Sequence, residues 1–299
     1  MIDMIKRAFK FGNLKYKIFC YFIILLGYSN SEIQDLEVRN KVSRYLKKKY
    51  AKELDSLYEE KTDYSNINKT VWVCWLQGYE NAPEIVKACI NSMYKWLIGY
   101  KIEIINKENI FNYIDLPQHI IEKWEKGIIS DTLFSDFIRL NVLYKYGGIW
   151  IDATVFFTGP LPQYINNSDF FMYRCNVYDV TKFGESWFIK SEIKHNRILK
   201  LTLDLMNKYW KKENKIKDYF QMFIFMNIVI NKYPEDVSGM IKIPSTIPHM
   251  LQGYLNERFD IKTYESICSI TNVHKLKYKD IYYEKKDSFA MYINNKYSK

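Results

Sequence analysis

The stretch SDTLFSDFIRLNVLYKYGGIWIDAT, residues 130–154, decides the fold that this chain is expected to adopt. Its first part carries apolar residues at helical spacing, which predicts an amphipathic helix, and the polar residues 130–132 supply candidates for its N-cap. Gly147 and Gly148 end this helix, and the apolar residues that follow predict a buried strand that stops at Asp152. An acidic side chain is therefore expected where a buried strand leaves the core.

Strands and helices alternate on both sides of this stretch. Residues 70–76 form a continuous apolar run typical of a buried strand, Pro83 suits the first turn of a helix, and residues 101–105 predict another strand. A strand, a helix and a strand at this spacing predict a βαβ unit, so the fold class is α/β, with a ligand site at the carboxyl ends of parallel strands. Further strands are expected at 169–173, 186–190, 240–243 and 266–271, and further helices at 198–209 and 220–228.

Three regions follow from composition and pattern. Residues 1–68 are expected to form a basic, helical N-terminal region, residues 69–280 the main domain, and residues 281–299 a basic C-terminal tail. Within the first region, apolar residues between Glu32 and Lys61 recur mostly at helical spacing, which predicts a long amphipathic helix.

Basic residues are in excess, and the excess lies at the two ends of the chain. The 299 residues include 44 Lys and Arg against 34 Asp and Glu, a net charge of +10. Residues 1–61 contribute +5 (13 against 8) and residues 272–299 contribute +4 (7 against 3). Such an excess suits nucleic acid, an anionic membrane or a phosphorylated ligand. Because the region between the ends is close to neutral, we favour a membrane at one end and a diphosphate at the other over nucleic acid.

The first 28 residues combine basic and apolar side chains. Five Lys and Arg precede the apolar run 18–26, which is about half of the roughly 20 residues that a bilayer-spanning helix needs. The run resembles a signal peptide but lacks an Ala-x-Ala-like site after it, so we expect an interfacial helix that holds the protein peripherally on the cytoplasmic face of the membrane. The alternative is a helix packed on the domain. The five cysteines show no zinc-binding spacing and indicate a reduced compartment.

Acidic and basic side chains are expected together at one edge of the sheet. Asp152 and Thr154 are two residues apart, so on an extended strand they would face one ligand. A carboxylate there can hold a divalent cation that bridges two phosphates, while Asp136 can accept hydrogen bonds from sugar hydroxyls and Arg139 can orient it or meet phosphate. These parts suit a sugar nucleotide. The alternative is that the Asp136–Arg139 pair is a surface ion pair and the glycines are only a helix cap.

The motif Ser135-Asp136-x-x-Arg139, followed by Gly147-Gly148-x-Trp150-x-Asp152, resembles the GT-A fold glycosyltransferases of the capsular polysaccharide synthesis type, which are related to sugar transferases of the family 32 type. The resemblance covers residues 69–280. It implies a Rossmann-like sheet that binds a nucleotide sugar, flanked by helices, and retention of anomeric configuration. It also implies roles by position: base and ribose binding for Trp75, Gln77 and Gly78, cofactor binding for Ser135, and metal and ribose binding for Asp152. Asp136 and Arg139 would be catalytic residues that contact the donor sugar. Asp218 and Glu185 would lie near the cleft, Asp218 as a further catalytic candidate, and the alternative for both is a structural role.

The chain departs from the related enzymes at Thr154, where the wider group has a second Asp. A neutral hydroxyl removes a negative charge from a site for Mn²⁺ or Mg²⁺, so metal affinity should fall or other ligands must compensate. The resemblance makes His274 the candidate third ligand, and a buried or surface histidine without a metal is the alternative. Lys275, Lys277 and Lys279 would stabilise the departing diphosphate, unless they belong to a solvated run of charge.

The leading hypothesis is a hexosyltransferase. It would move galactose, or else glucose, from a UDP-sugar to a glycan acceptor, lipid-linked, in capsular or surface polysaccharide synthesis. A catalytically silent partner that binds a nucleotide sugar is the alternative, and Thr154 gives it weight. A nucleic-acid-binding protein and a two-carboxylate glycosidase fit less well, because Asp136 and Asp152 are expected at a sheet edge beside a nucleotide-binding strand.

Overall fold

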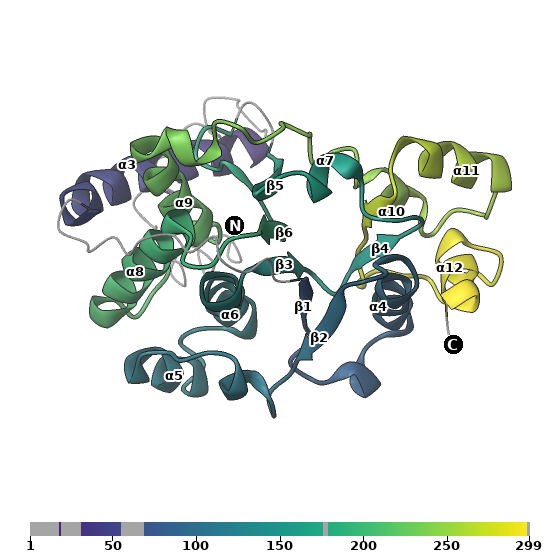
Figure 1. Ribbon diagram of the computed structural model, residues 1–299, viewed down its shortest axis with the longest axis horizontal. Helices are drawn as coiled ribbons and strands as arrows, with labels where there is room; N and C mark the ends of the chain where they lie inside the picture. The colour runs from purple at the N-terminus through teal and green to yellow at the C-terminus, as the bar shows by residue number, and fades with distance from the viewer. Residues whose placement is uncertain (1–17, 19–30, 55–68, 176–178, 298–299) are drawn as a thin grey trace.

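A five-stranded sheet in the order β2-β1-β3-β6-β5 forms the centre of the computed structural model, which describes residue 18 and residues 31–54, 69–175 and 179–297 (Figure 1). β1 (Thr70–Cys74) pairs in parallel with both β2 (Lys101–Ile105) and β3 (Gly148–Ile151). β6 (Gly184–Ser191) runs antiparallel to β3 and to β5 (Phe170–Arg174). The predicted α/β class is confirmed, and the sheet is mixed rather than fully parallel.

Helices cover both faces of this sheet. Figure 1 shows α6 (Asp131–Tyr146), α8 (Arg197–Lys212) and α9 (Gln221–Lys232) on one side, and α4 (Glu84–Trp96) and α12 (Phe289–Tyr297) on the other. The βαβ unit predicted between residues 70 and 105 is present as β1, α4 and β2. The shorter elements are α5 (Gln118–Glu125), α7 (Gln163–Asn166), α10 (Met250–Tyr254), α11 (Ile261–Ile270) and the 3₁₀ helices η1 (Tyr79–Asn81), η2 (Ile110–Asn112) and η3 (Pro234–Val237).

The passage from α6 into β3 follows the predicted pattern. Ser130 is the N-cap, with its hydroxyl accepting a hydrogen bond from the backbone N–H of Leu133, and Gly147 is the C-cap. Gly147 and Gly148 have φ values of 70° and 97°, which a residue with a Cβ rarely adopts. The indole Nε1 of Trp72 in β1 donates to the Gly147 carbonyl at 2.9 Å. The glycine pair thus lets the chain turn directly from the helix into the strand beside β1.

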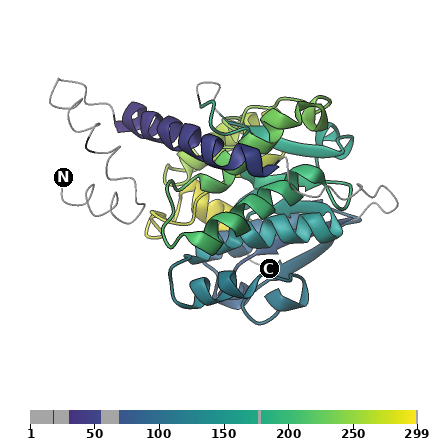
Figure 2. The ribbon, with the colours of Figure 1, turned by 90° about the vertical axis from the view of Figure 1, so that its left-hand side faces the viewer.

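The N-terminal helix α3 (Ser31–Leu54) packs on the domain. Figure 2 shows it lying across the helices of one face, where it contacts α8 and α9. Its apolar stripe is buried, with Val38, Val42, Leu46, Tyr50 and Leu54 each at most 2% exposed. The predicted amphipathic helix is therefore confirmed over residues 31–54. The expected interfacial helix of residues 1–28, apart from residue 18, and the end of the predicted helix, residues 55–61, lie outside the described residues.

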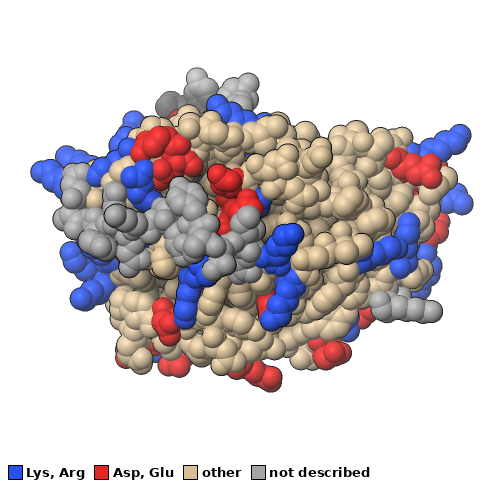
Figure 3. Space-filling view, viewed as in Figure 1, with Lys and Arg blue, Asp and Glu red and all other residues tan. Residues whose placement is uncertain are grey.

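The helices that the structure describes include none that is both long and apolar enough to cross a bilayer. Charged side chains on the face shown in Figure 3 form several separate groups, with acidic groups and uncharged surface between the basic ones.

A two-stranded antiparallel sheet of β4 (Val155–Phe157) and β7 (Val273–Lys275) lies beside α4 and α10. The strand predicted at residues 266–271 is wrong, because these residues belong mostly to α11. Asp260 caps that helix by accepting from the backbone N–H of Thr263 at 2.7 Å, and Tyr264 and Ile267 form its buried stripe. Residues 240–243 do not form a strand either, and the β contact there is an isolated bridge between Arg174 and Pro244.

The segment expected as a basic tail contains α12. Phe289, Ala290 and Ile293 of this helix are buried, and α12 packs against α4. The indole Nε1 of Trp96 in α4 donates to the Tyr297 hydroxyl at 3.2 Å. Residues 289–297 are therefore part of the folded domain.

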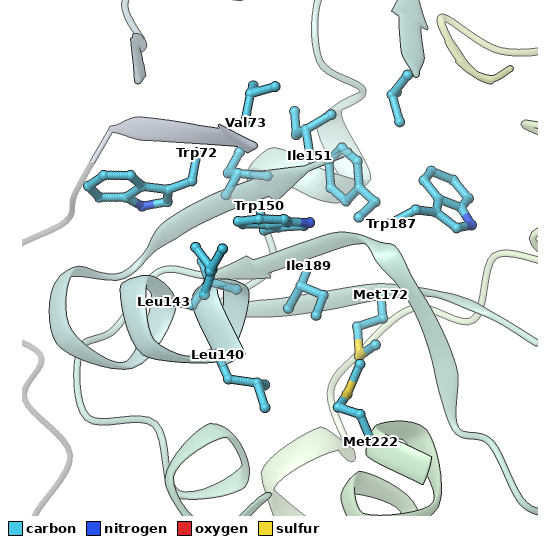
Figure 4. Packing of buried hydrophobic residues seen from close by; sticks show 14 of the residues in the cluster. Trp72, Val73, Leu140, Leu143, Trp150, Ile151, Met172, Trp187, Ile189 and Met222 are labelled. Atoms are coloured by element: carbon cyan, nitrogen blue, oxygen red, sulfur yellow. The ribbon is translucent and has the colours of Figure 1, made fainter. Parts of the chain in front are cut away.

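The packed core around β3 fixes the positions of the neighbouring strand ends. Figure 4 shows side chains of the sheet, among them Trp72, Trp150 and Ile189, together with Leu143 of α6. Trp150 is 1% exposed and is among the largest fully buried side chains. Because close-packed interiors tolerate little displacement, this packing holds the ends of β1 and β3 in place.

Gly148 offers a direct test of the turn into β3. A Cβ at this position would lie 2.4 Å from the carbonyl oxygen of Thr70, and the φ of 97° adds strain. We expect Gly148→Ala to lower the free energy of unfolding by about 3 kcal/mol or more, measured by urea denaturation. Gly253→Ala in α10 is the matched control, because a Cβ added there would meet no atom within 4 Å. The control should leave stability unchanged or raise it by up to about 1 kcal/mol; equal losses in both variants would contradict the argument.

Candidate active site

A pocket of about 620 Å³ lies at the carboxyl ends of β1 and β3. Five segments build it: the end of β1 with the residues after it, the first turns of α6, the end of β3 with the turn after it, α10, and the chain at the end of β7 and beyond. Most of the predicted site residues line it, namely Trp75, Gln77, Ser135, Arg139, Asp152, Thr154, Lys275 and Lys277. The expected ligand site at the edge of the sheet is therefore present as a pocket.

Arg139 lies at the floor of this pocket and is 6% exposed. Its Nη1 is 3.0 Å from Oδ1 of Asp136, and its Nη2 is 3.5 Å from Oδ1 of Asp152. Nη1 also donates to the hydroxyl of Ser186 at the start of β6, and Nη2 donates to the hydroxyl of Ser135 at 3.2 Å. The Asp136–Arg139 pair is thus buried rather than a surface ion pair, and it joins α6 to the ends of β3 and β6.

Asp152 is held in one orientation by its neighbours. The indole Nε1 of Trp150 donates to its Oδ1 at 2.9 Å, and the guanidinium of Arg139 lies 5.1 Å from the Trp150 ring centre. The side chain of Asp152 remains 31% exposed toward the pocket. The Asp152 carboxylate is therefore open to a bound ligand.

The expectation that Asp152 and Thr154 lie on an extended strand is wrong. β3 ends at Ile151, and the backbone N–H of Val155 donates to the Asp152 carbonyl at 2.9 Å, which closes a turn. Both side chains nevertheless line the pocket. The turn therefore places the side chains of Asp152 and Thr154 on one pocket, which an extended strand was expected to do.

Thr154 is in contact with Lys275. The Lys275 Nζ donates to the Thr154 Oγ1 at 2.6 Å and to the Leu276 carbonyl at 3.1 Å. The backbone N–H of Leu276 donates to the Thr154 carbonyl at 2.9 Å. Two segments 121 residues apart in the chain thus meet at the wall of the pocket.

His274 does not join this group. Lys275 pairs with Val155 across the two strands and faces the pocket, so the preceding residue points to the opposite side. His274 is 0% exposed, its Nε2 is 2.9 Å from the Thr158 hydroxyl, and burial lowers its pKa to about 4. This position matches the alternative expectation of a buried histidine without a metal.

Asp218 does not line the pocket either. Its Oδ1 accepts from the backbone N–H of Phe220 at 2.8 Å and lies 3.5 Å from Nε of Arg39 in α3. Burial raises the pKa of Asp218. This carboxylate therefore attaches α3 to the loop before α9, which matches the structural alternative. Gly78, with a φ of 83°, lies in the turn after Trp75 and is likewise absent from the described lining.

The lining also includes residues that were not predicted from the sequence, among them Asp131, Gln252 and Tyr278. Tyr278 meets Trp75 edge to face, with ring centres 5.3 Å apart. Lys279, the third of the alternating lysines at 275, 277 and 279, also lines the pocket. Gln252 lies on the short helix α10, far from any motif, and no signal in the sequence points to it.

Asp136 lies behind Arg139 rather than in the pocket lining that the structure describes. It is 7% exposed, and burial raises its pKa to about 6 against the attraction of the neighbouring Arg139. Since its carboxylate contacts Arg139, it acts on a ligand through that side chain. We therefore assign Asp136 as a positioning residue and correct the expectation of direct sugar contact.

The pocket lining supplies only part of the predicted set of metal ligands. Of the three expected ligands, Asp152 and Thr154 share the pocket, whereas His274 points away from it. Within residues 31–54, 69–175 and 179–297, no three His, Cys, Asp or Glu side chains are grouped so that they could hold a metal ion. Mg²⁺ in nucleotide sites is usually bound by one or two carboxylates together with waters and substrate phosphates, and of the three expected ligands only Asp152 brings a carboxylate to the pocket.

Comparisons with known proteins agree with the predicted resemblance. Residues 23–295 match the family described as "Capsular polysaccharide synthesis protein". An O-glycosyltransferase, braB, of Annulohypoxylon truncatum is 30% identical over 98 residues, and the O-glycosyltransferase PaGT of Phomopsis amygdali is 26% identical over 99 residues. Each match covers 30% of this chain, and the chain spans only 23% and 24% of these relatives' lengths.

Among solved structures, the PaToxG glycosyltransferase is 16% identical, covering 67% of this chain and 78% of that one, with a TM-score of 0.38. The apo form of the glycosyltransferase GlyE of Streptococcus pneumoniae TIGR4 is 12% identical, covering 77% and 63%, with a TM-score of 0.38.

The buried Asp136 predicts a pH-dependent stability. Because its folded-state pKa of about 6 lies above the ordinary 3.8, its contribution to stability is full below pH 3.8 and is lost as the pH rises through 6. Asp136→Asn does not titrate at this position. We expect the free energy of unfolding of the wild type, relative to this variant, to fall by about 2 kcal/mol between pH 4 and pH 7. Urea denaturation across this range measures it, and a constant difference would contradict the assignment.

Proposed function

The chain belongs to the capsular polysaccharide synthesis protein family, and on this basis we propose that it is a retaining glycosyltransferase that moves a hexose from a UDP-sugar to a glycan acceptor. UDP-galactose is the first candidate donor and UDP-glucose the second. The acceptor would be a growing, lipid-linked surface glycan. One observation carries the proposal: a buried Arg139, held by Asp136 and Asp152, forms the floor of a pocket at the carboxyl ends of parallel strands.

The lining supports a role for each part of such a donor. The aromatic pair of Trp75 and Tyr278 offers apolar surface to the base, and Gln77 offers an amide for hydrogen bonding. The Asp152 carboxylate can accept hydrogen bonds from ribose or sugar hydroxyls, while Arg139 and the lysines can face phosphate oxygens. The donor would therefore lie along the edge of the sheet from β1 to β3.

In the proposed reaction, the bond between the sugar C1 and the β-phosphate oxygen breaks, and UDP leaves with the bonding electron pair. A bond forms between C1 and an acceptor hydroxyl oxygen, and the proton of that hydroxyl passes to the oxygen of the departing diphosphate. Negative charge grows on the departing diphosphate, so cationic groups in the pocket stabilise the transition state more than the ground state.

Thr154 favours a second candidate, a silent partner that binds the nucleotide sugar in an assembly complex without transferring it. Such a protein would bind UDP-sugars in the same pocket and release no UDP. Measuring both binding and release therefore separates the two functions.

Incubation with a panel of UDP- and GDP-sugars, with Mn²⁺ or with EDTA, tests the proposal through the released nucleoside diphosphate. We expect release from UDP-galactose or UDP-glucose. Asp152→Asn keeps an acceptor for Trp150 but removes the charge that faces the pocket, and it should lower turnover by about 100-fold or more.

Asp115→Asn serves as its control, because this carboxylate is 89% exposed and lies outside the pocket. It should retain wild-type turnover. Release of UDP by Asp152→Asn at the wild-type rate would contradict the enzyme assignment, as would the absence of release with every donor.

We further propose peripheral association with an anionic membrane on its cytoplasmic face. The support is the basic and apolar composition of residues 1–28, in which each basic group near an anionic leaflet contributes about 1 kcal/mol. Deletion of residues 1–28 should move the protein from the membrane fraction to the soluble fraction of a cell lysate, and a bilayer association that survives the deletion would reject this anchor.

A further inference from the structure

Backbone pairing fixes the position of the Lys275 main chain. Lys275 lies opposite Val155 in the antiparallel pair of β4 and β7, and its backbone N–H donates to the Pro248 carbonyl at 2.8 Å. The next residue, Leu276, is hydrogen-bonded through its N–H to the Thr154 carbonyl at 2.9 Å. The ammonium group therefore stands beside Thr154 because of the fold.

Together, Lys275 and Thr154 present hydrogen-bond donors to the pocket. An ammonium group has three N–H donors, and two of those of Lys275 are used by the Thr154 hydroxyl and the Leu276 carbonyl. The Thr154 oxygen accepts from Lys275, which leaves the hydroxyl hydrogen available to donate. A second Asp at position 154 would instead present lone pairs to a cation. The exchange of Asp for Thr beside a lysine therefore suits an anion rather than a metal ion.

The charged residues that line the pocket also favour an anionic ligand. Four basic residues line it (Arg139, Lys275, Lys277 and Lys279) against two acidic ones (Asp131 and Asp152). Asp152 already faces Arg139 at 3.5 Å and accepts from Trp150, so its charge is partly neutralised. A dication bound to the Thr154 oxygen would lie next to the ammonium group 2.6 Å from that oxygen, and the two would repel each other.

We propose that Lys275, together with Thr154, binds the diphosphate of the nucleotide directly and takes the place of a divalent cation. This inference rests on the proposed function, because it names how that pocket holds the same donor. Lys275 supplies the positive charge that a metal held by a pair of acids would otherwise supply. Lys277 and Lys279 add further positive charge along the pocket. Nucleotide binding would then be independent of divalent metal.

Isothermal titration of the full-length protein with UDP, once in EDTA and once in Mn²⁺, tests this. We expect dissociation constants that agree within about twofold in the two buffers. Lys275→Met should weaken UDP binding in EDTA by about tenfold or more, because a charge-assisted hydrogen bond to phosphate is lost. Lys275→Arg, which keeps the cation, should retain most of the affinity, so a fold defect in the methionine variant can be recognised.

Lys262→Met is the matched control, since this exposed lysine lies on α11 and does not line the pocket. Its affinity for UDP should equal that of the wild type. The double variant Thr154→Asp with Lys275→Met restores a second carboxylate and removes the competing charge, and it should bind UDP more tightly in Mn²⁺ than in EDTA by about tenfold.

The outcomes separate this inference from the proposed function. Binding of UDP only in Mn²⁺ would overturn the lysine site while leaving a nucleotide-binding protein. Wild-type affinity of Lys275→Met in EDTA would overturn it as well. No binding of UDP in either buffer would overturn both the inference and the proposed function.

Discussion

The burial of one guanidinium group organises this protein. Arg139 is 6% exposed, and a buried cation is stable only when opposite charges and hydrogen-bond acceptors surround it. Asp136 in α6, Asp152 after β3 and the Ser186 hydroxyl at the start of β6 meet this need together. Because each partner comes from a different element, the same contacts that neutralise Arg139 also hold α6, the end of β3 and the start of β6 together. The floor of the pocket is therefore part of the core, with only Asp152 reaching toward solvent.

A second constraint is the pairing of β4 with β7, which decides the chemistry of the pocket wall. Neighbouring residues on a strand face opposite sides, so the register that opposes Lys275 to Val155 sends the lysine to the pocket and His274 into the core. A shift of one residue would exchange the two. An ammonium group and an imidazole have different uses, since the first binds anions and the second, when neutral, binds metals. The register therefore decides whether this wall of the pocket suits an anion or a metal ion.

The ends of the described chain belong to the same folded unit. α3 lies on α8 and α9 through its apolar stripe, with Arg39 forming an ion pair with Asp218, and α12 lies on α4 on the other side of the sheet. The family match of residues 23–295 contains α3 and most of α12, and it extends beyond the region of resemblance at each end. The acid expected to act on the ligand, Asp218, instead ties one of these helices to the domain.

The sequence alone determined the α/β class, most strands and helices, and the order of the residues from Ser130 to Asp152, because these depend on local periodicity, caps and glycine conformations. It also indicated Ser135, Arg139 and Asp152 as pocket residues, since short motifs fix their spacing. It failed at residues 266–271, where a cap and a buried stripe outweigh β-prone residues. The tertiary structure alone decided that Asp136 is shielded by Arg139, that His274 faces the core, and that Lys275 meets Thr154. These outcomes depend on strand register and on contacts between segments 121 residues apart, which no local pattern records.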